Sequence, residues 1–319
     1  MRSWINSLVV AAFLLCFCGI ITGQTPSNAV NLYQHGTSKL NKNDLDGAIT
    51  DFTKAIELSS RLGPAKNNNA SKLTNEFITD VEAANVTVVD PFTAQVYCNR
   101  GIARMRKGEY DMAIQDFTHA IRIRPNLTEA YLNRGAAKRA IGDPTGALAD
   151  TEKALSFKGD LYHAYNNRAS IRYDLKDFDG ALADLNRAIE LNSKIPEPFY
   201  NRAYVRVQKR DFDGAMEDFN HAIQLNDHIA EPYHGRGTLW MMKAKFDEAI
   251  ADFSHAIELQ PTRSISYMNR GLALTVRGRD EEAKKDFEKC LELDPTVKAD
   301  LEQRITSAKN IRYALLVKN

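Results

Sequence analysis

The sequence of 319 residues lacks an excess of charge of either sign, since 42 Lys plus Arg stand against 41 Asp plus Glu. A nucleic-acid-binding chain usually carries a basic excess on one face, and this composition offers none. We therefore predict that the chain has no nucleic-acid partner.

Marks of catalysis are also missing from the sequence. It contains no Gly-rich phosphate loop and no nucleophile–base spacing. His119, His221 and His255 recur in one slot, but other copies of that slot hold Lys or Arg. A slot that accepts any cation indicates a solvated face rather than a metal or acid–base site. We predict that the chain is not an enzyme and that it binds no cofactor and no metal.

Cysteine is rare, with four residues in the whole chain. Cys16 and Cys18 lie in an apolar N-terminal run, and Leu15 and Phe17 precede them. A bacterial lipoprotein site needs a small residue before its cysteine, so we predict no lipid anchor there.

What the sequence does contain is a repeat. The segment Tyr131-Leu132-Asn133-Arg134-Gly135 returns in altered copies, and each copy starts 34 residues after the last. An alanine follows each glycine slot at a fixed distance, namely Ala113, Ala147, Ala181, Ala215, Ala249 and Ala283. A fixed period of this size predicts a repeat solenoid.

Each period holds two segments of helical periodicity. In residues 94–127 the first predicted helix runs from about Ala94 to Lys107, and the second from about Asp111 to Arg122. Gly108 separates the helices and Pro125 ends the second one, because proline lacks the N–H that a helix needs. Two helices of this length bury a face only when neighbouring copies stack.

An aromatic residue near each repeat start, the Gly slot and the recurrent Ala slots together resemble the tetratricopeptide repeat family. The aromatic residues are Tyr97, Tyr131, Tyr165, Phe199, Tyr233 and Tyr267. The resemblance implies an all-α fold: a right-handed superhelical solenoid of antiparallel helix pairs. It also implies that the first helices line a concave groove that binds other proteins.

The same spacings divide the rest of the chain. A degenerate repeat is predicted at 29–62, an insertion at 63–93, six repeats of 34 residues at 94–297, and a capping helix at 298–319. Leu301, Ile305 and Ala308 form the apolar stripe of the capping helix. The insertion is either a binding loop or a tolerated disordered bulge.

The N-terminal residues 1–23 are predicted to be a signal peptide. Arg2 precedes an apolar run from Leu8 to Ile21, which is too short for a comfortable membrane span at about 14 residues. An uncleaved membrane anchor is the alternative. We therefore expect an exported protein that is periplasmic, envelope-associated or secreted. Three sequons, at Asn69, Asn85 and Asn126, matter only if a eukaryote secretes the chain.

After the leader, Cys98 and Cys290 remain, in the second and the last predicted repeats. A disulfide needs Cα atoms within about 7 Å, so we expect that these two residues do not pair within one molecule.

The residue before each glycine slot is arginine, where the family usually has leucine, and the second helix carries aspartate where an aromatic is common. The arginines are Arg100, Arg134, Arg168, Arg202, Arg236 and Arg270, and the aspartates are Asp116, Asp150, Asp184, Asp218, Asp252 and Asp286. These coupled replacements predict a structural ion pair in every repeat, and solvated surface charges are the alternative. If the pair forms, Arg168→Leu destabilises and a second change, Asp184→Leu, recovers much of the loss.

An asparagine precedes most of these arginines and projects about 100° away from it on the helix. Asn99, Asn133, Asn167, Asn201 and Asn269 would form a ladder along the groove, interrupted at Gly235. The ladder is similar to the asparagine ladder in the superhelix of the O-linked N-acetylglucosamine transferase family. An amide both donates and accepts, so it can hold a peptide backbone of any sequence. Tyr200, Tyr204, Tyr233 and Met242 are the predicted apolar anchors.

The predicted function is that of a non-enzymatic scaffold that binds an extended segment of a partner protein in its concave groove. The alternative is a self-assembling envelope scaffold, a homo-oligomer that forms through the insertion or the ends of the array. The sequence leaves the identity of the partner open.

Overall fold

A computed structural model describes residues 27–60 and 91–317, and the described chain is helical with short turns. The predicted signal peptide and nearly all of the predicted insertion lie outside these residues. The helix α3 begins at Pro91, so its first residues fall within the range assigned to the insertion. None of the described helices is both long enough and apolar enough to cross a membrane.

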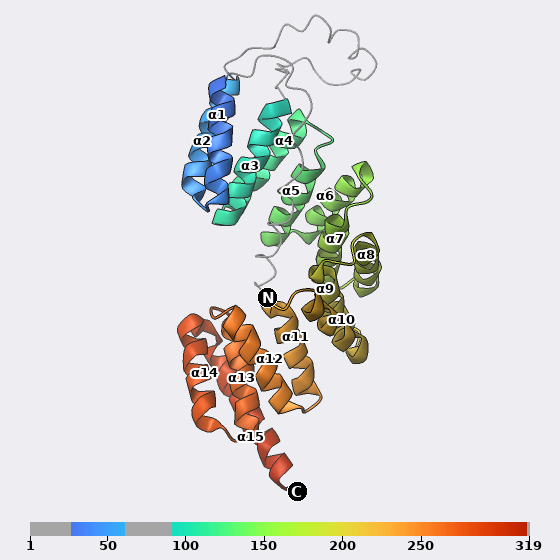
Figure 1. Cartoon of the computed structure of the whole chain (residues 1–319), viewed down its shortest axis with the longest axis vertical. Helices are drawn as coiled ribbons and strands as arrows, with labels where there is room; N and C mark the ends of the chain where they lie inside the picture. The colour runs from blue at the N-terminus through green and yellow to red at the C-terminus, as the bar shows by residue number, and fades with distance from the viewer. Residues whose placement is uncertain (1–26, 61–90, 318–319) are drawn as a thin grey trace, which may run out of the picture. The chain divides into compact units, whose positions relative to one another are not determined.

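The chain divides into two compact units, Met1–Asp160 and Leu161–Asn319. The first unit holds α1 (Ser27–Asn41), α2 (Leu45–Ser60), α3 (Pro91–Lys107), α4 (Tyr110–Ile123), α5 (Thr128–Ala140) and α6 (Pro144–Phe157). The second unit holds α7 (Tyr162–Asp174), α8 (Phe178–Leu191), α9 (Pro196–Gln208), α10 (Phe212–Leu225), α11 (Ala230–Met242), α12 (Phe246–Leu259), α13 (Ser264–Val276), α14 (Asp280–Leu293), the 3-10 turn η3 (Pro295–Val297) and α15 (Lys298–Val317). The predicted all-α array of antiparallel helix pairs is confirmed (Figure 1).

The turn inside each helix pair places one residue in the left-handed region. That residue is glycine in three pairs, Gly108, Gly142 and Gly278, and a side-chain-bearing residue in the others. Several second helices then begin at an aspartate whose side chain accepts a hydrogen bond from the backbone N–H of a glycine three residues on, as in Asp177 with Gly180. Such a cap satisfies one of the free N–H groups at the start of a helix.

Within each unit the helices form two layers that differ in closeness. Consecutive first helices contact each other, as α1 does α3, α3 does α5, α7 does α9, α9 does α11 and α11 does α13. Among the described helices, consecutive second helices make no comparable contacts. The first helices therefore lie on the inner, concave side of each unit, as the family resemblance implies.

The core between the layers depends on close approach at the glycine slots. Phe117 on α4 is fully buried, and a Cβ atom at Gly101 on α3 would lie 2.7 Å from its ring. Gly36 and Phe52 repeat this arrangement between α1 and α2. Since a Cβ atom leaves no room for the ring at that distance, glycine in this slot sets the spacing of the two helices.

Candidate interaction surface and the polar network between helix pairs

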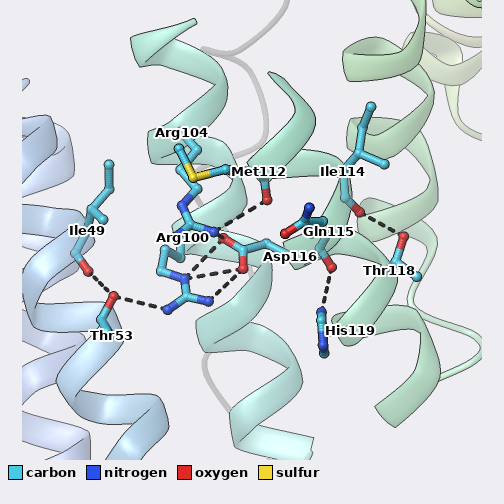
Figure 2. A network of polar contacts seen from close by, with 10 residues as sticks. All are labelled: Ile49, Thr53, Arg100, Arg104, Met112, Ile114, Gln115, Asp116, Thr118 and His119. Atoms are coloured by element: carbon cyan, nitrogen blue, oxygen red, sulfur yellow. Dashed lines mark hydrogen bonds and ion pairs between the residues drawn. The ribbon is translucent and has the colours of Figure 1, made fainter. Parts of the chain in front are cut away.

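The arginine before the glycine slot makes contacts on three sides. Arg100 Nη2 donates to Asp116 Oδ1 at 2.7 Å, and Arg100 Nη1 donates to Thr53 Oγ1 at 3.0 Å (Figure 2). The guanidinium carbon of Arg100 lies 5.3 Å from the centre of the Tyr97 ring. Asp116 is on the second helix of the same pair, whereas Thr53 is on the second helix of the preceding pair. One side chain therefore ties two helix pairs together.

The same bidentate pair is formed in every predicted repeat from 94 to 297. The Nη2–Oδ1 distances are 2.7 Å for Arg100–Asp116, 2.7 Å for Arg134–Asp150, 2.6 Å for Arg168–Asp184, 2.7 Å for Arg202–Asp218, 2.7 Å for Arg236–Asp252 and 2.7 Å for Arg270–Asp286. The aspartates are nearly inaccessible and the arginines only partly exposed, so these are structural pairs, not solvated surface charges.

Sequence reasoning missed the second partner of these arginines. Small polar residues on the preceding second helix accept from Nη1, namely Thr53, Thr118, Asn186, Asn220 and Ser254. From Thr118 onward they recur at the repeat period, with Glu152 in the one copy between Thr118 and Asn186, and that recurrence is the signal that could have identified them.

A second cation reaches the aspartate in some repeats only. Arg104, Lys138, Arg172 and Arg206 contact the other carboxylate oxygen, at 2.9, 2.8, 2.7 and 2.9 Å respectively. The corresponding residues in the last two repeats are Trp240 and Leu274, which carry no charge. The carboxylate is thus shared between two cations at one end of unit 2 and paired with one arginine at the other.

The predicted asparagine ladder is partly used to join first helices. Asn99 is 6% exposed, and its Nδ2 donates to Tyr33 Oη on α1 at 3.1 Å. Asn201 is equally buried, and its Nδ2 donates to Asn166 Oδ1 on α7 at 2.8 Å. The side-chain amides of Asn99 and Asn201 are therefore hydrogen-bonded within the chain.

The other ladder residues are more accessible. Asn133, Asn167 and Asn269 are half-buried. Asn133 also hydrogen-bonds to the side chain of Cys98. These three residues keep part of their surface exposed, although the side-chain oxygen of Asn167 is itself buried.

The interruption of the ladder at Gly235 has a packing cause. A Cβ atom at Gly235 would overlap the ring of Phe219 on α10. In the pair α9–α10, which contains Phe219, the glycine slot holds Ala203, and the Cβ atom of Ala203 occupies space next to the same ring. In the preceding pair the three corresponding residues are Ala169, Leu185 and Asn201, and the smaller leucine leaves room for the asparagine.

The four predicted anchors occupy different environments. Tyr200 is 4% exposed, and Tyr233 is 7% exposed and lies between Arg236 and His255. Tyr204 is half-buried, and its hydroxyl donates to the Glu231 carbonyl oxygen at 3.1 Å. Tyr200 and Tyr233 thus serve packing between helix pairs, which sequence spacing alone could not distinguish from display in a groove.

Met242 is the exception among these anchors. Its side chain is 56% exposed at the end of α11. Of the four, it has the most surface to offer a partner.

Tetratricopeptide repeat models match residues 29–61, 94–127, 162–195, 196–228 and 264–297, more than half of the chain in total. The chain belongs to the tetratricopeptide repeat family. No curated protein matches the sequence significantly.

Solved structures of tetratricopeptide arrays share the fold. A tetratricopeptide repeat protein from Parabacteroides merdae is similar over 90% of this chain and 100% of its own, with a TM-score of 0.63 and 18% identity. The APC/C hetero-tetramer Cut9–Hcn1 matches 86% of this chain and 55% of its own, with a TM-score of 0.62 and 14% identity. Pseudomonas aeruginosa PilF matches 63% of this chain and 92% of its own, with a TM-score of 0.56 and 18% identity.

The concave side of this tetratricopeptide array carries a group of ionisable residues where α9, α11 and α13 meet. Arg263 Nη1 lies 3.6 Å from Glu231 Oε1, and both side chains are largely buried. Burial raises the pKa of Glu197, and the Glu231 carboxylate raises it further. Burial also raises the pKa of Tyr204 to about 12, so its hydroxyl stays protonated.

His234 is buried close enough to Arg263 to interact with its charge. Its Nδ1 is 3.0 Å from Ser266 Oγ, and burial together with the Arg263 charge lowers the pKa of the imidazole to about 3. The ring is therefore neutral near pH 7. The repeat spacing predicts a groove position for His234, the one that Tyr200 holds one period earlier.

Cys98 and Cys290 are both buried free thiols. Burial raises the pKa of Cys98 to about 12, which keeps it as an unreactive thiol. In the part of the chain that the structure describes, no group of three or more His, Cys, Asp or Glu is arranged to hold a metal ion.

Proposed function

We propose that the chain holds an extended segment of a partner protein along the concave side of its first helices. Tetratricopeptide repeat proteins generally serve as protein-interaction scaffolds, and the family is typically non-catalytic. The observation that carries the proposal is a row of side chains at the ends of first helices. Asp174, Gln208 and Met242 recur at the repeat period, and all three are exposed.

The contacts along this row would be mixed in character. Met242 supplies an adaptable apolar surface, and Gln208 offers a donor and an acceptor together. Asn167 on α7 supplies a further amide from the ladder. Asn99 and Asn201 contribute by fixing neighbouring first helices, because both are buried.

Site-specific photo-crosslinking in cells that make the protein tests this proposal. A photoreactive amino acid is placed at Gln208 or Met242 on first helices, and at Ala183 or Ala251 as controls. The two alanines are exposed on second helices, away from the concave layer. We expect crosslinks to one continuous segment of a partner from the first-helix positions only. Equal crosslinking from all four positions would contradict groove binding.

We also propose that the protein is exported, on the basis of residues 1–23. N-terminal sequencing of the mature protein after fractionation of the cells tests this. A mature chain that begins near Gln24 in an extracytoplasmic fraction supports export, and an intact Met1 in the cytoplasmic fraction contradicts it.

A further inference from the structure

The last helix, α15, covers a part of the array that is open in the preceding repeat. Met268, Leu272 and Val276 on α13 correspond, one period later, to His234, Thr238 and Met242 on α11. Met242 is 56% exposed, whereas Val276 is 6% exposed. The difference arises because Leu301, Ile305 and Ala308 of α15 pack into the cluster that contains the three α13 residues.

This position differs from that of a first helix in a further repeat. Consecutive pairs in unit 2 meet through the second helix of one and the first helix of the next, as α12 meets α13. In contrast, the helix packing of α15 within the described chain is against α13 and the turn η3. The helix α15 runs alongside α13, and its C-terminal end continues past it (Figure 1). It therefore lies on the groove-facing side of the last first helix.

The attachment of α15 is small for its length. Of the 20 residues from Lys298 to Val317, only Leu301 and Ala308 are buried. Near its other end, Arg312 Nη1 lies 2.8 Å from Asp280 Oδ2, and this pair is exposed to solvent. Ordering a helix costs conformational entropy at every residue, and two buried side chains with one exposed ion pair offset little of it.

Residues beyond Arg312 add no burial. Tyr313, Leu316 and Val317 are 72%, 67% and 68% exposed. Elements with few buried contacts open locally, at a lower free energy than the whole domain. The helix α15 is thus the part of unit 2 best placed to leave the array while the rest stays folded.

We propose that α15 is a displaceable latch over Met268, Leu272 and Val276, and that this apolar strip receives an amphipathic helix of a partner when α15 leaves. The partner helix would carry apolar residues at positions i, i+4 and i+7, as Leu301, Ile305 and Ala308 do. The inference rests on the proposed role of the concave side, but it concerns a different subsite. An extended segment would lie along α7 to α11, whereas a helix would occupy α13.

The test uses the full-length chain and a labelled synthetic peptide of residues 298–317 as the probe. Arg312→Glu removes the ion pair with Asp280 and leaves the apolar strip intact. Lys309→Glu is the matched control, because it makes the same charge change at an exposed position of α15. An exposed ion pair changes an equilibrium by up to about fivefold. We expect Arg312→Glu to raise amide exchange in α15 about two- to fivefold, and Lys309→Glu to leave it unchanged.

Arg312→Glu should also strengthen binding of the probe, and Lys309→Glu should leave it unchanged. The probe's apparent affinity depends on the fraction of molecules whose strip is open, so it should bind the Arg312→Glu variant two- to fivefold more tightly than wild type. Adding Asp280→Arg should restore the ion pair and the wild-type affinity. Adding Leu272→Ala to Arg312→Glu should weaken the probe, provided that circular dichroism shows an unchanged fold.

Three results would overturn the proposal. The α15 amides could exchange only together with those of α13, the probe could bind wild type and Arg312→Glu equally, or it could bind neither. A concentration-dependent dimer of Arg312→Glu would show that the strip takes α15 of a second copy instead. Because the probe is the chain's own helix, failure here leaves the photo-crosslinking test of the proposed function unaffected.

Discussion

Two regions of unit 2 carry the same Arg–Asp pair in different surroundings. In the pairs α7–α8 and α9–α10 a second arginine reaches the carboxylate, as Arg206 reaches Asp218. In the pairs α11–α12 and α13–α14 the carboxylate has the single bidentate arginine, as Asp252 has Arg236. The motif is repeated, but its local charge balance is not. Identical residues at equivalent positions of different repeats therefore need not contribute equally to stability.

The largest expected effect comes from removing the carboxylate. Deleting one partner of a largely buried ion pair costs about 3–5 kcal/mol, because the other charge stays desolvated. Asp252→Ala leaves one unpaired arginine, whereas Asp218→Ala leaves two close together. We expect both variants to unfold at lower urea concentration, with the larger loss for Asp218→Ala. Equal losses would show that the second arginine is solvated and contributes nothing.

The second arginine also changes the result expected from the double-mutant cycle, which therefore differs between repeats. Arg236→Leu with Asp252→Leu removes both charges and should recover most of the single-variant loss. Arg168→Leu with Asp184→Leu leaves Arg172 without the carboxylate that it contacts at 2.7 Å. Recovery should therefore be smaller at Asp184 than at Asp252. Additive losses at both sites would exclude coupling within the pair.

A second comparison concerns the ladder position. Gly235→Asn restores the asparagine found in other repeats, but its side chain would enter the space of the Phe219 ring. Overpacking of this kind costs about 3 kcal/mol. Phe219→Leu, which copies Leu185 of the preceding pair, should relieve most of that loss. The check is urea denaturation of the two single variants and the double variant, and a double variant less stable than Gly235→Asn alone would refute the packing explanation.

The period and the apolar spacing were enough to predict the fold, because both depend on residues that recur in every repeat. They also indicated the Arg–Asp partners, since two unusual residues changed together. It was harder to predict which side chains are exposed for contact with a partner and which are packed between helices. Tyr233 and Met242 are both apolar residues of α11, yet one is stacked on Arg236 and the other is exposed. Which face a residue uses depends on its neighbours in adjacent pairs, and these contacts do not follow a single period.

A third difference between the regions concerns pH. His234 on α11 stands where α9 has Tyr200, and its folded pKa is lowered from 6.5 to about 3. Below about pH 6.5 the imidazole of the unfolded chain binds a proton, whereas that of the folded chain does not. The free energy of unfolding therefore decreases as the pH falls from about 6.5 toward 3. At pH 4.5 the loss relative to pH 7 should be about 2.5 kcal/mol.

His234→Asn tests this assignment, because α7 holds Asn166 at the same position. Urea denaturation of wild type and variant is compared at pH 7 and pH 4.5. Carboxylates that titrate in this range are common to both proteins, so the difference between them isolates the imidazole. An equal loss of stability on acidification in both would show that His234 is protonated in the folded state.

The smallest expected effect concerns the left-handed turn residue. Ala244 has φ +56°, whereas the matching residue of the next pair, Gly278, has φ +75°. A left-handed conformation costs a residue with a Cβ atom about 1 kcal/mol, and glycine avoids that cost. Ala244→Gly should therefore raise the free energy of unfolding by about 1 kcal/mol, and Gly278→Ala should lower it by a similar amount. Ala251→Gly, at an exposed position inside α12, is the control and should destabilise by up to about 1 kcal/mol, because glycine is a poor helix former. If Ala244→Gly and Ala251→Gly shift the urea midpoint in the same direction, backbone strain at the turn is not what distinguishes the two helix pairs.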